Sequence, residues 1–211
     1  PTGWGVEQQI TCVDGSTFQM YMANMKSIFM DMIKNTDMVI FNRCKKEDPL
    51  PTYRRGIKVA NQRAEVIFED EEGELGDIFQ DEMPFDMNAP VIEILPEDYG
   101  IWFVDAMDHP ENYEGKTVKF KARVMKPRGM GSKFFVPGRT AMTCCADDTT
   151  FLGYVCKSAY APKLTPGEWV EVTAKVGIEK RNEYQGEEGI VLAAEHVEQC
   201  DPLEDEMVYF N

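Results

Sequence analysis

The 211-residue sequence predicts an α/β segment followed by an all-β segment. In residues 9–68, short apolar runs alternate with longer stretches in which apolar residues recur every three or four positions, the order strand, helix, strand, helix, strand. From residue 115 the apolar period changes to two, as in strands with one buried face. These patterns indicate a partial parallel sheet covered by helices and then a small five-stranded barrel.

Residues 1–95 are predicted to form the α/β domain, a partial sheet of the P-loop type. Its elements are expected at residues 9–13, 18–33, 38–41, 50–61 and 64–68. Right-handed crossovers of this length place the helices over a parallel sheet and the ligand-binding loops at the carboxyl ends of the strands. Residues 90–95 are apolar as well and are interpreted as a last strand of this domain.

Three polar residues, Asp14, Asn42 and Arg43, follow the first two predicted strands. An amide at Asn42 can tether a loop and face a purine, and the long stem of Arg43 can pack over the base. The sequence therefore predicts a nucleotide-binding loop. Guanine recognition would need a carboxylate three residues after the Asn, but Lys45 stands there, so selectivity for guanine is not predicted. The alternative is an Asn that caps a turn after a buried strand.

Three runs, at residues 11–18 (TCVDGSTF), 37–44 (DMVIFNRC) and 57–67 (IKVANQRAEVI), together resemble the second half of the CobW-like, G3E-type P-loop GTPases. The resemblance implies nucleotide binding by Asn42, Arg43 and Asp14 and a role in metal handling or metallocofactor assembly. A phosphate-binding G-x-x-x-x-G-K-[ST] motif is absent. We therefore expect a C-terminal fragment that does not hydrolyse GTP by itself and could bind GTP only with a missing N-terminal part.

Residues 96–114 are predicted to form a connecting helix and linker, and residues 115–211 the barrel. Strands are expected at 117–125, 133–145, 151–156, 169–176 and 190–197. The OB-fold is the commonest five-stranded barrel of this size. Residues 113–118, 135–139 and 207–210 resemble a barrel-like C-terminal module of bacterial proteins associated with putative permeases.

Cysteines supply the candidate metal ligands. Cys144, Cys145 and Cys156 could hold zinc if His196 or Cys200 joined them. Neighbouring strand residues point to opposite faces, so only one of Cys144 and Cys145 can face a given site. The alternative is that these thiols only pack in the core. The six cysteines lack the spacing of a disulfide framework, which favours reduced thiols and a cytoplasmic location.

Charge limits the expected partners. The chain carries 37 acidic and 22 basic residues, for a net charge of −15, which opposes binding to nucleic acid. No apolar run reaches the length of a membrane span. The sequence begins at Pro1, which we interpret as a piece of a longer chain. Expected partners are a second copy bound at the exposed edge of the truncated sheet, the missing N-terminal half, a metal ion or a client protein.

Two further hypotheses remain beside the GTPase-fragment interpretation. In the first, the chain is a non-catalytic ligand- or partner-binding module built on the barrel, and the α/β half is a scaffold or dimer surface. In the second, the barrel binds single-stranded nucleic acid through stacking aromatic residues and a local basic patch, against the net charge. The aromatic residues concerned are Phe134, Phe135, Tyr154 and Trp169; the basic ones are Lys119, Lys121, Arg123, Lys126 and Arg128.

Overall fold

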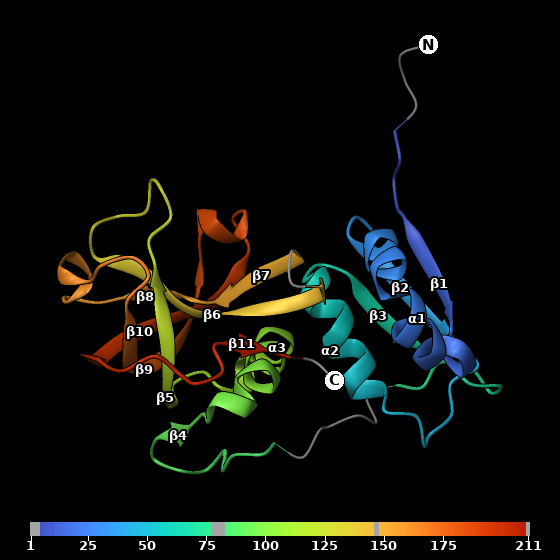
Figure 1. Cartoon of the computed structure of the whole chain (residues 1–211), viewed down its shortest axis with the longest axis horizontal. Helices are drawn as coiled ribbons and strands as arrows, with labels where there is room; N and C mark the ends of the chain where they lie inside the picture. Colours follow the sequence, from blue (N-terminus) through green and yellow to red (C-terminus); the bar gives the residue numbers. More distant parts are fainter. Residues whose placement is uncertain (1–4, 77–82, 146–147, 210–211) are drawn as a thin grey trace. The chain divides into compact units, whose positions relative to one another are not determined.

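A computed structural model describes residues 5–76, 83–145 and 148–209 of the chain (Figure 1). The chain divides into two compact units. The first, called the α/β unit, comprises Pro1–Glu82, Met142–Thr150 and Phe210–Asn211; the second, called the barrel unit, comprises Met83–Ala141 and Phe151–Tyr209. The predicted combination of an α/β part and a five-stranded barrel is confirmed.

The α/β unit contains a three-stranded parallel sheet in the order β1-β2-β3. Its elements are β1 (Ile10–Asp14), α1 (Gly15–Ile33), β2 (Met38–Asn42), α2 (Leu50–Ala60) and β3 (Glu65–Phe68). All five predicted elements are present, with ends that differ by up to three residues. The apolar runs specify strands here because each strand buries alternate residues under the helices, for example Val39 and Phe41 of β2.

Aromatic packing around Phe18 holds both helices on one face of the sheet. The Phe18 ring contacts Phe29 in α1, Phe41 in β2 and Tyr53 in α2, with centroid separations of 5.1, 4.9 and 4.6 Å and edge-on geometry. The Asn61 amide donates 2.8 Å hydrogen bonds to the carbonyls at the end of α1 and in the following turn. One hydrophobic core therefore contains residues from β1, β2, β3, α1 and α2.

The opposite face of this sheet is apolar but incompletely covered. Ile10 is 47% exposed and Cys12 is exposed, whereas Met38, Ile40 and Ile67 on the same face are half-buried. Parallel sheets are normally buried on both faces. The α/β unit therefore presents more apolar sheet surface than its own two helices cover.

The predicted apolar stripe of α1 is only partly buried. Phe18, Met30 and Ile33 enter the core, but Ile28 and Met32 are 62% and 55% exposed. A kink at Met25, where φ is −137° and ψ is 31°, interrupts the helix. The apolar spacing therefore predicted the helix correctly but overestimated how much of the stripe faces the core, because the two halves of α1 do not share one face.

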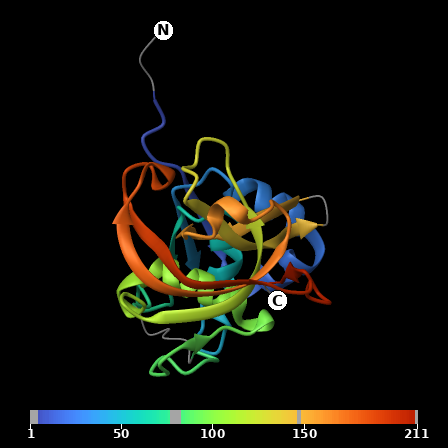
Figure 2. The same cartoon turned by 90° about the vertical axis from the view of Figure 1, so that its left-hand side faces the viewer.

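The barrel unit is built on a closed five-stranded barrel (Figure 2). Its strands are β5 (Thr117–Met125), β6 (Phe134–Cys145), β8 (Val155–Lys157), β9 (Trp169–Lys180) and β10 (Glu188–Gln199). The order around the barrel is β6-β8-β10-β9-β5, and β5 closes on β6. The β8–β10 pair is parallel and the other pairs are antiparallel. This layout is compatible with an OB-fold.

Three short strands extend the barrel sheet: β4 (Ile92–Glu93), β7 (Asp148–Gly153) and β11 (Met207–Val208). Strand β4 pairs with β5 in parallel, Ile92 opposite Val118. The run at residues 90–95 therefore contributes the two-residue strand β4 to the barrel sheet and is not the last strand of the α/β domain. The division between the compact units falls at residues 82 and 83, earlier than the expected end of the first domain at residue 95.

The connecting helix predicted within residues 96–114 is a 3-10 turn, η1 (Pro96–Asp98), continued by α3 (Tyr99–Asp108), and its aromatic residues pack against the barrel strands. Trp102 packs on Phe120 of β5 at 4.8 Å, and Phe103 stacks on Tyr154 at 4.8 Å. Figure 1 shows α3 beside the barrel strands. Aromatic side chains therefore fill the interior.

Arg139 ties the C-terminal segment to the barrel. Its side chain is buried and donates to the carbonyl oxygens of Pro96, Asp205 and Met207, the latter two at 3.0 and 3.1 Å. Its guanidinium also lies 5.7 Å from the centre of the Tyr99 ring. Burial lowers the Arg139 pKa from its ordinary value. The fixed fork of an arginine suits three separate carbonyl acceptors.

Strands β6 and β7 approach each other closely at two glycines. A Cβ atom on Gly153 would lie 2.6 Å from the Pro137 carbonyl oxygen, and a Cβ on Gly138 would overlap the Leu152 carbonyl oxygen. Both obstacles are backbone atoms, which cannot move away independently. The close approach of β6 and β7 therefore requires glycine at both positions.

We predict that Gly153→Ala lowers the free energy of unfolding by about 1–3 kcal/mol, because the added methyl group forces the two strands apart. The matched control is Gly177→Ala in β9, where the new Cβ would meet the Val191 carbonyl oxygen at an ordinary 3.7 Å. Chemical denaturation of both variants measures the difference. Equal stabilities would contradict the close approach.

Candidate functional site

The structure brings the three predicted nucleotide-site residues together. Asp14 ends β1, Asn42 ends β2, and Arg43 follows Asn42 with a left-handed φ of 55°. The Arg43 guanidinium forms an ion pair with Asp14 at 2.7 Å. The prediction of proximity succeeded because the carboxyl ends of adjacent parallel strands lie at one edge of a sheet.

Asp14 also caps α1. Its Oδ1 accepts hydrogen bonds from the Ser16 amide at 3.1 Å and the Ser16 hydroxyl at 2.6 Å. The Ser16 hydroxyl, with Arg43 as a smaller contributor, lowers the Asp14 pKa below its ordinary value. Next to it, a Cβ on Gly15 would lie 2.8 Å from the Cys44 sulfur, so the helix begins in direct contact with the loop after β2. These contacts give Asp14 a structural role.

Asn42 and Arg43, the other two residues of this cluster, lie in different environments. The Arg43 side chain is 74% exposed, whereas the Asn42 Oδ1 atom is buried and has no hydrogen-bond partner in the described part of the chain. Cys44 is buried, and burial raises its thiol pKa to about 11. A nucleotide-binding role for Asp14, Asn42 and Arg43 stays a prediction.

We predict that Asp14→Ala lowers the melting temperature at neutral pH, because α1 loses its cap and Arg43 its partner. The folded-state pKa of Asp14 lies below its ordinary value, so the stabilisation is present at neutral pH and is lost as pH falls through that lower pKa. The melting temperatures of wild type and variant should therefore converge below about pH 4. Asp31→Ala is the control, since Asp31 is 82% exposed and pairs loosely with Lys34. A constant difference from pH 7 to pH 3 would contradict the role of the ionised carboxylate.

The structure tests the predicted zinc ligands only in part. Cys156 is fully buried, and burial raises its thiol pKa to about 12. The side chains of Cys144 and Cys145 lie outside the described residues. Cys156 is opposite Leu192 in β10, and His196 lies beyond a bulge in that strand with its side chain 61% exposed, so the buried Cys156 and His196 do not lie in one environment. Among described residues, no three His, Cys, Asp or Glu side chains form a metal-binding group. Zinc binding stays a prediction.

Cys12 is exposed, in contrast to Cys44 and Cys156. Thiolates are the reactive species, and burial of Cys44 and Cys156 disfavours both ionisation and access. We predict that an alkylating reagent modifies Cys12 in the native protein much faster than Cys44 or Cys156, as measured by peptide mass spectrometry. Denaturation should abolish the difference. Rapid native modification of Cys156 would contradict its burial.

Most of the aromatic residues proposed to stack on nucleic acid are part of the barrel core. Phe135, Tyr154 and Trp169 are between 0% and 5% exposed. The remaining one, Phe134, is half-buried under the Arg181 guanidinium, 4.4 Å from its ring centre. Three of the four rings therefore cannot stack on a base in this fold, because alternation along the strands turns them inward.

The outer surface of the α/β unit carries features that sequence reasoning missed. An apolar groove of about 240 Å³, called the β1–α1 groove, lies along the first strand and helix. Its lining is Thr11, Cys12, Val13, Asp14, Tyr21, Met25, Ile28, Phe29 and Met32. The recurrence of apolar residues every three or four positions in α1 was the available signal, but it predicted a helix that covers the sheet with its apolar side. Met25 and Met32 are instead 41% and 55% exposed.

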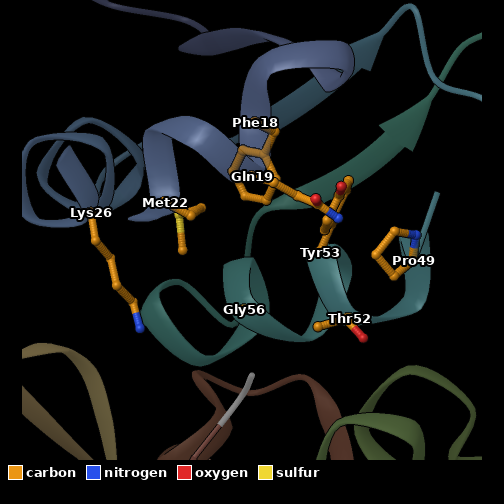
Figure 3. A pocket seen from close by; sticks show the side chains of 8 residues that line it. All are labelled: Phe18, Gln19, Met22, Lys26, Pro49, Thr52, Tyr53 and Gly56. Carbon is orange, nitrogen blue, oxygen red and sulfur yellow. The ribbon is translucent and has the colours of Figure 1, made fainter. Parts of the chain in front are cut away.

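A second pocket, of about 300 Å³, separates α1 from α2 and is called the α1–α2 pocket (Figure 3). It is lined by Phe18, Gln19, Met22, Lys26, Pro49, Thr52, Tyr53 and Gly56. Figure 3 shows that the first four side chains come from α1 and the others from α2 and the residue before it. A glycine within a predicted helix was the available sequence signal for this space.

Comparison with known families decides the relationship of the chain. Residues 74–210 match the sequence model described as the DUF1980 C-terminal domain. The chain belongs to this family. The resemblance to CobW-like GTPases was wrong, because the family whose model matches the chain is DUF1980. The DUF1980 match also replaces the resemblance to a permease-associated module. The DUF1980 description names no ligand or reaction.

Other comparisons add little to the DUF1980 match. No curated protein matches the chain. The mitochondrial single-stranded DNA-binding protein Rim1 of S. cerevisiae is 10% identical over 42% of this chain and 97% of that chain, with a TM-score of 0.25. Aspartyl tRNA synthetase from Entamoeba histolytica is 18% identical over 49% of this chain and 22% of that chain, with a TM-score of 0.28. Neither similarity supports an argument about function. No described helix is long and apolar enough to span a bilayer.

Proposed function

We propose that this DUF1980-family chain is a non-catalytic binding module whose α/β unit associates with a second copy of itself. The observation that carries the proposal is the open edge of β1 beside the exposed apolar residues of α1. In the described part of the chain, β1 pairs only with β2. The edge of β3 is different, because Leu75 donates a 2.8 Å backbone hydrogen bond to Phe68 and Glu69 bridges to Glu74.

The backbone of β1 supports pairing with another strand. The Gln9 carbonyl accepts from Asp37 and Met38 on the β2 side. By alternation, the backbone groups of Ile10 and Cys12 point to the open edge. Two β1 strands can therefore pair antiparallel about a two-fold axis near Ile10, which also brings residues 5–9 into the pairing. Val6 in that segment is 85% exposed. Such an isologous contact joins two three-stranded sheets into one.

Charge favours a second copy at this surface. Residues 5–34 contain three acidic and two basic residues, a net charge of −1, whereas the whole chain has a net charge of −15. Two like-charged chains repel one another least where their surfaces are nearly neutral. The exposed side chains of Tyr21, Ile28 and Met32 would add apolar burial to the backbone pairing. The open edge of β1 and the exposed apolar residues of α1 therefore both favour a second copy of the chain as the partner.

We predict that the wild-type chain sediments as a dimer and that Ile10→Pro and Ile28→Glu each weaken the dimer by about tenfold or more. Proline removes an outward N–H at the first residue of an edge strand, where it is tolerated. Glutamate places a charge in the apolar contact. Val91→Glu is the matched control, because Val91 is 40% exposed and lies in the barrel unit. Sedimentation equilibrium over a wide range of concentration measures the effect.

A monomeric wild type would overturn the proposal. A dimer equally weakened by Val91→Glu, or insensitive to both α/β-unit variants, would place the association elsewhere and would also overturn it. Circular dichroism of each variant distinguishes loss of association from loss of folding.

A further inference from the structure

We propose that the α1–α2 pocket binds a small organic acid with an aromatic or fused-ring body. The ring would lie against the apolar wall to which Met22 and the largely buried Phe18 and Tyr53 contribute, and the anionic group would lie near Lys26. Ligand pockets range from about 300 to 1,000 Å³ and combine apolar walls with a few polar groups. A pocket of about 300 Å³ is at the lower end of that range and suits a compact ligand.

The apolar part of the pocket is formed by rigid groups. Phe18 and Tyr53 are only 3% and 5% exposed, so they support the wall of the pocket from behind, and their rings meet edge-on at 4.6 Å. Burial raises the Tyr53 pKa, and its hydroxyl is hydrogen-bonded to the Gln19 side chain. Met22, whose flexible thioether adapts to ring-shaped partners, completes this side (Figure 3). These groups favour a flat apolar body over a charged or extended one.

Gly56 supplies an independent reason to regard the space as a binding pocket. It lies within α2, where glycine is about 1 kcal/mol less favourable than alanine. It has no positive φ, and a Cβ built on it meets no atom within 4 Å. Neither backbone geometry nor packing within the protein therefore requires glycine here. Its effect is to leave one wall of the pocket without a side chain.

The charge of the lining indicates the sign of the ligand. Lys26 is the charged residue among the eight that line the pocket, and no carboxylate is among them. It is half-buried, and no ion pair joins it to another described residue. The lining of the pocket therefore carries one positive charge and no negative one, although the chain as a whole has a net charge of −15. The amide of Gln19 and the hydroxyl of Thr52 add hydrogen-bonding groups at the rim.

The pocket is separate from the proposed dimer surface. Phe18, Met22 and Lys26 line the α1–α2 pocket, whereas Ile28 and Met32 line the β1–α1 groove. Ligand binding and self-association can therefore be tested independently.

The test uses the whole chain and two probes, 1-naphthoate and its neutral counterpart 1-naphthalenemethanol, followed by calorimetry and by amide chemical shifts. We expect 1-naphthoate to bind more tightly than the alcohol and to shift the amides of residues lining the pocket. Lys26→Glu should weaken naphthoate about tenfold or more while leaving the alcohol nearly unchanged. Lys46→Glu, an exposed lysine outside the pocket, is the matched control for charge. Gly56→Leu should weaken both probes about tenfold or more by filling the space.

Three outcomes would overturn the proposal. The first is no shift at the pocket with either probe. The second is equal weakening of naphthoate by Lys26→Glu and Lys46→Glu, which would leave only a general charge effect. The third is full binding of both probes by Gly56→Leu. Circular dichroism establishes that this variant is folded, and Lys26→Glu, a change at a partly exposed helix position, provides a test that does not depend on Gly56.

Discussion

The placement of both helices on one face of a three-stranded parallel sheet is the constraint on which the α/β unit depends. Two successive right-handed crossovers in one direction require that placement. The Phe18 cluster stabilises it, because its ring contacts α1, α2 and β2 at once. The same constraint leaves the other face only partly covered and, among the described residues, the outer edge of β1 unpaired. Core formation and the proposed association surface therefore have one physical origin.

The barrel unit covers its strand edges and its apolar interior in a different way from the α/β unit. Closure of β5 on β6 gives every barrel strand two neighbours, and α3 fills the interior with aromatic rings. Gly138 and Gly153 permit the close strand approach, and Arg139 fixes the C-terminal segment through carbonyl acceptors. Few large apolar side chains remain exposed on this unit.

Asp14 has structural contacts in addition to its predicted role in nucleotide binding. The residue caps α1, pairs with Arg43 and lies beside the buried Cys44. Each of these contacts already explains why a carboxylate is useful at the end of β1. The α1–α2 pocket is different, because Gly56 and Lys26 have no comparable explanation within the protein. That difference is why the proposed ligand site lies between the helices and not at the strand ends.

The sequence by itself determined the order of elements and the meeting of Asp14, Asn42 and Arg43. The period of the apolar residues distinguishes strands from helices, which gives the order of elements. Adjacent parallel strands have their carboxyl ends at the same edge of the sheet, which brings the three residues together. Only the tertiary structure decided that β4 joins the barrel sheet, because two residues acquire strand structure only through a partner, here β5. It likewise decided that Ile28 and Met32 stay exposed and that Phe135, Tyr154 and Trp169 turn inward. Periodicity shows that a face is apolar, but whether that face is covered depends on residues distant in the chain.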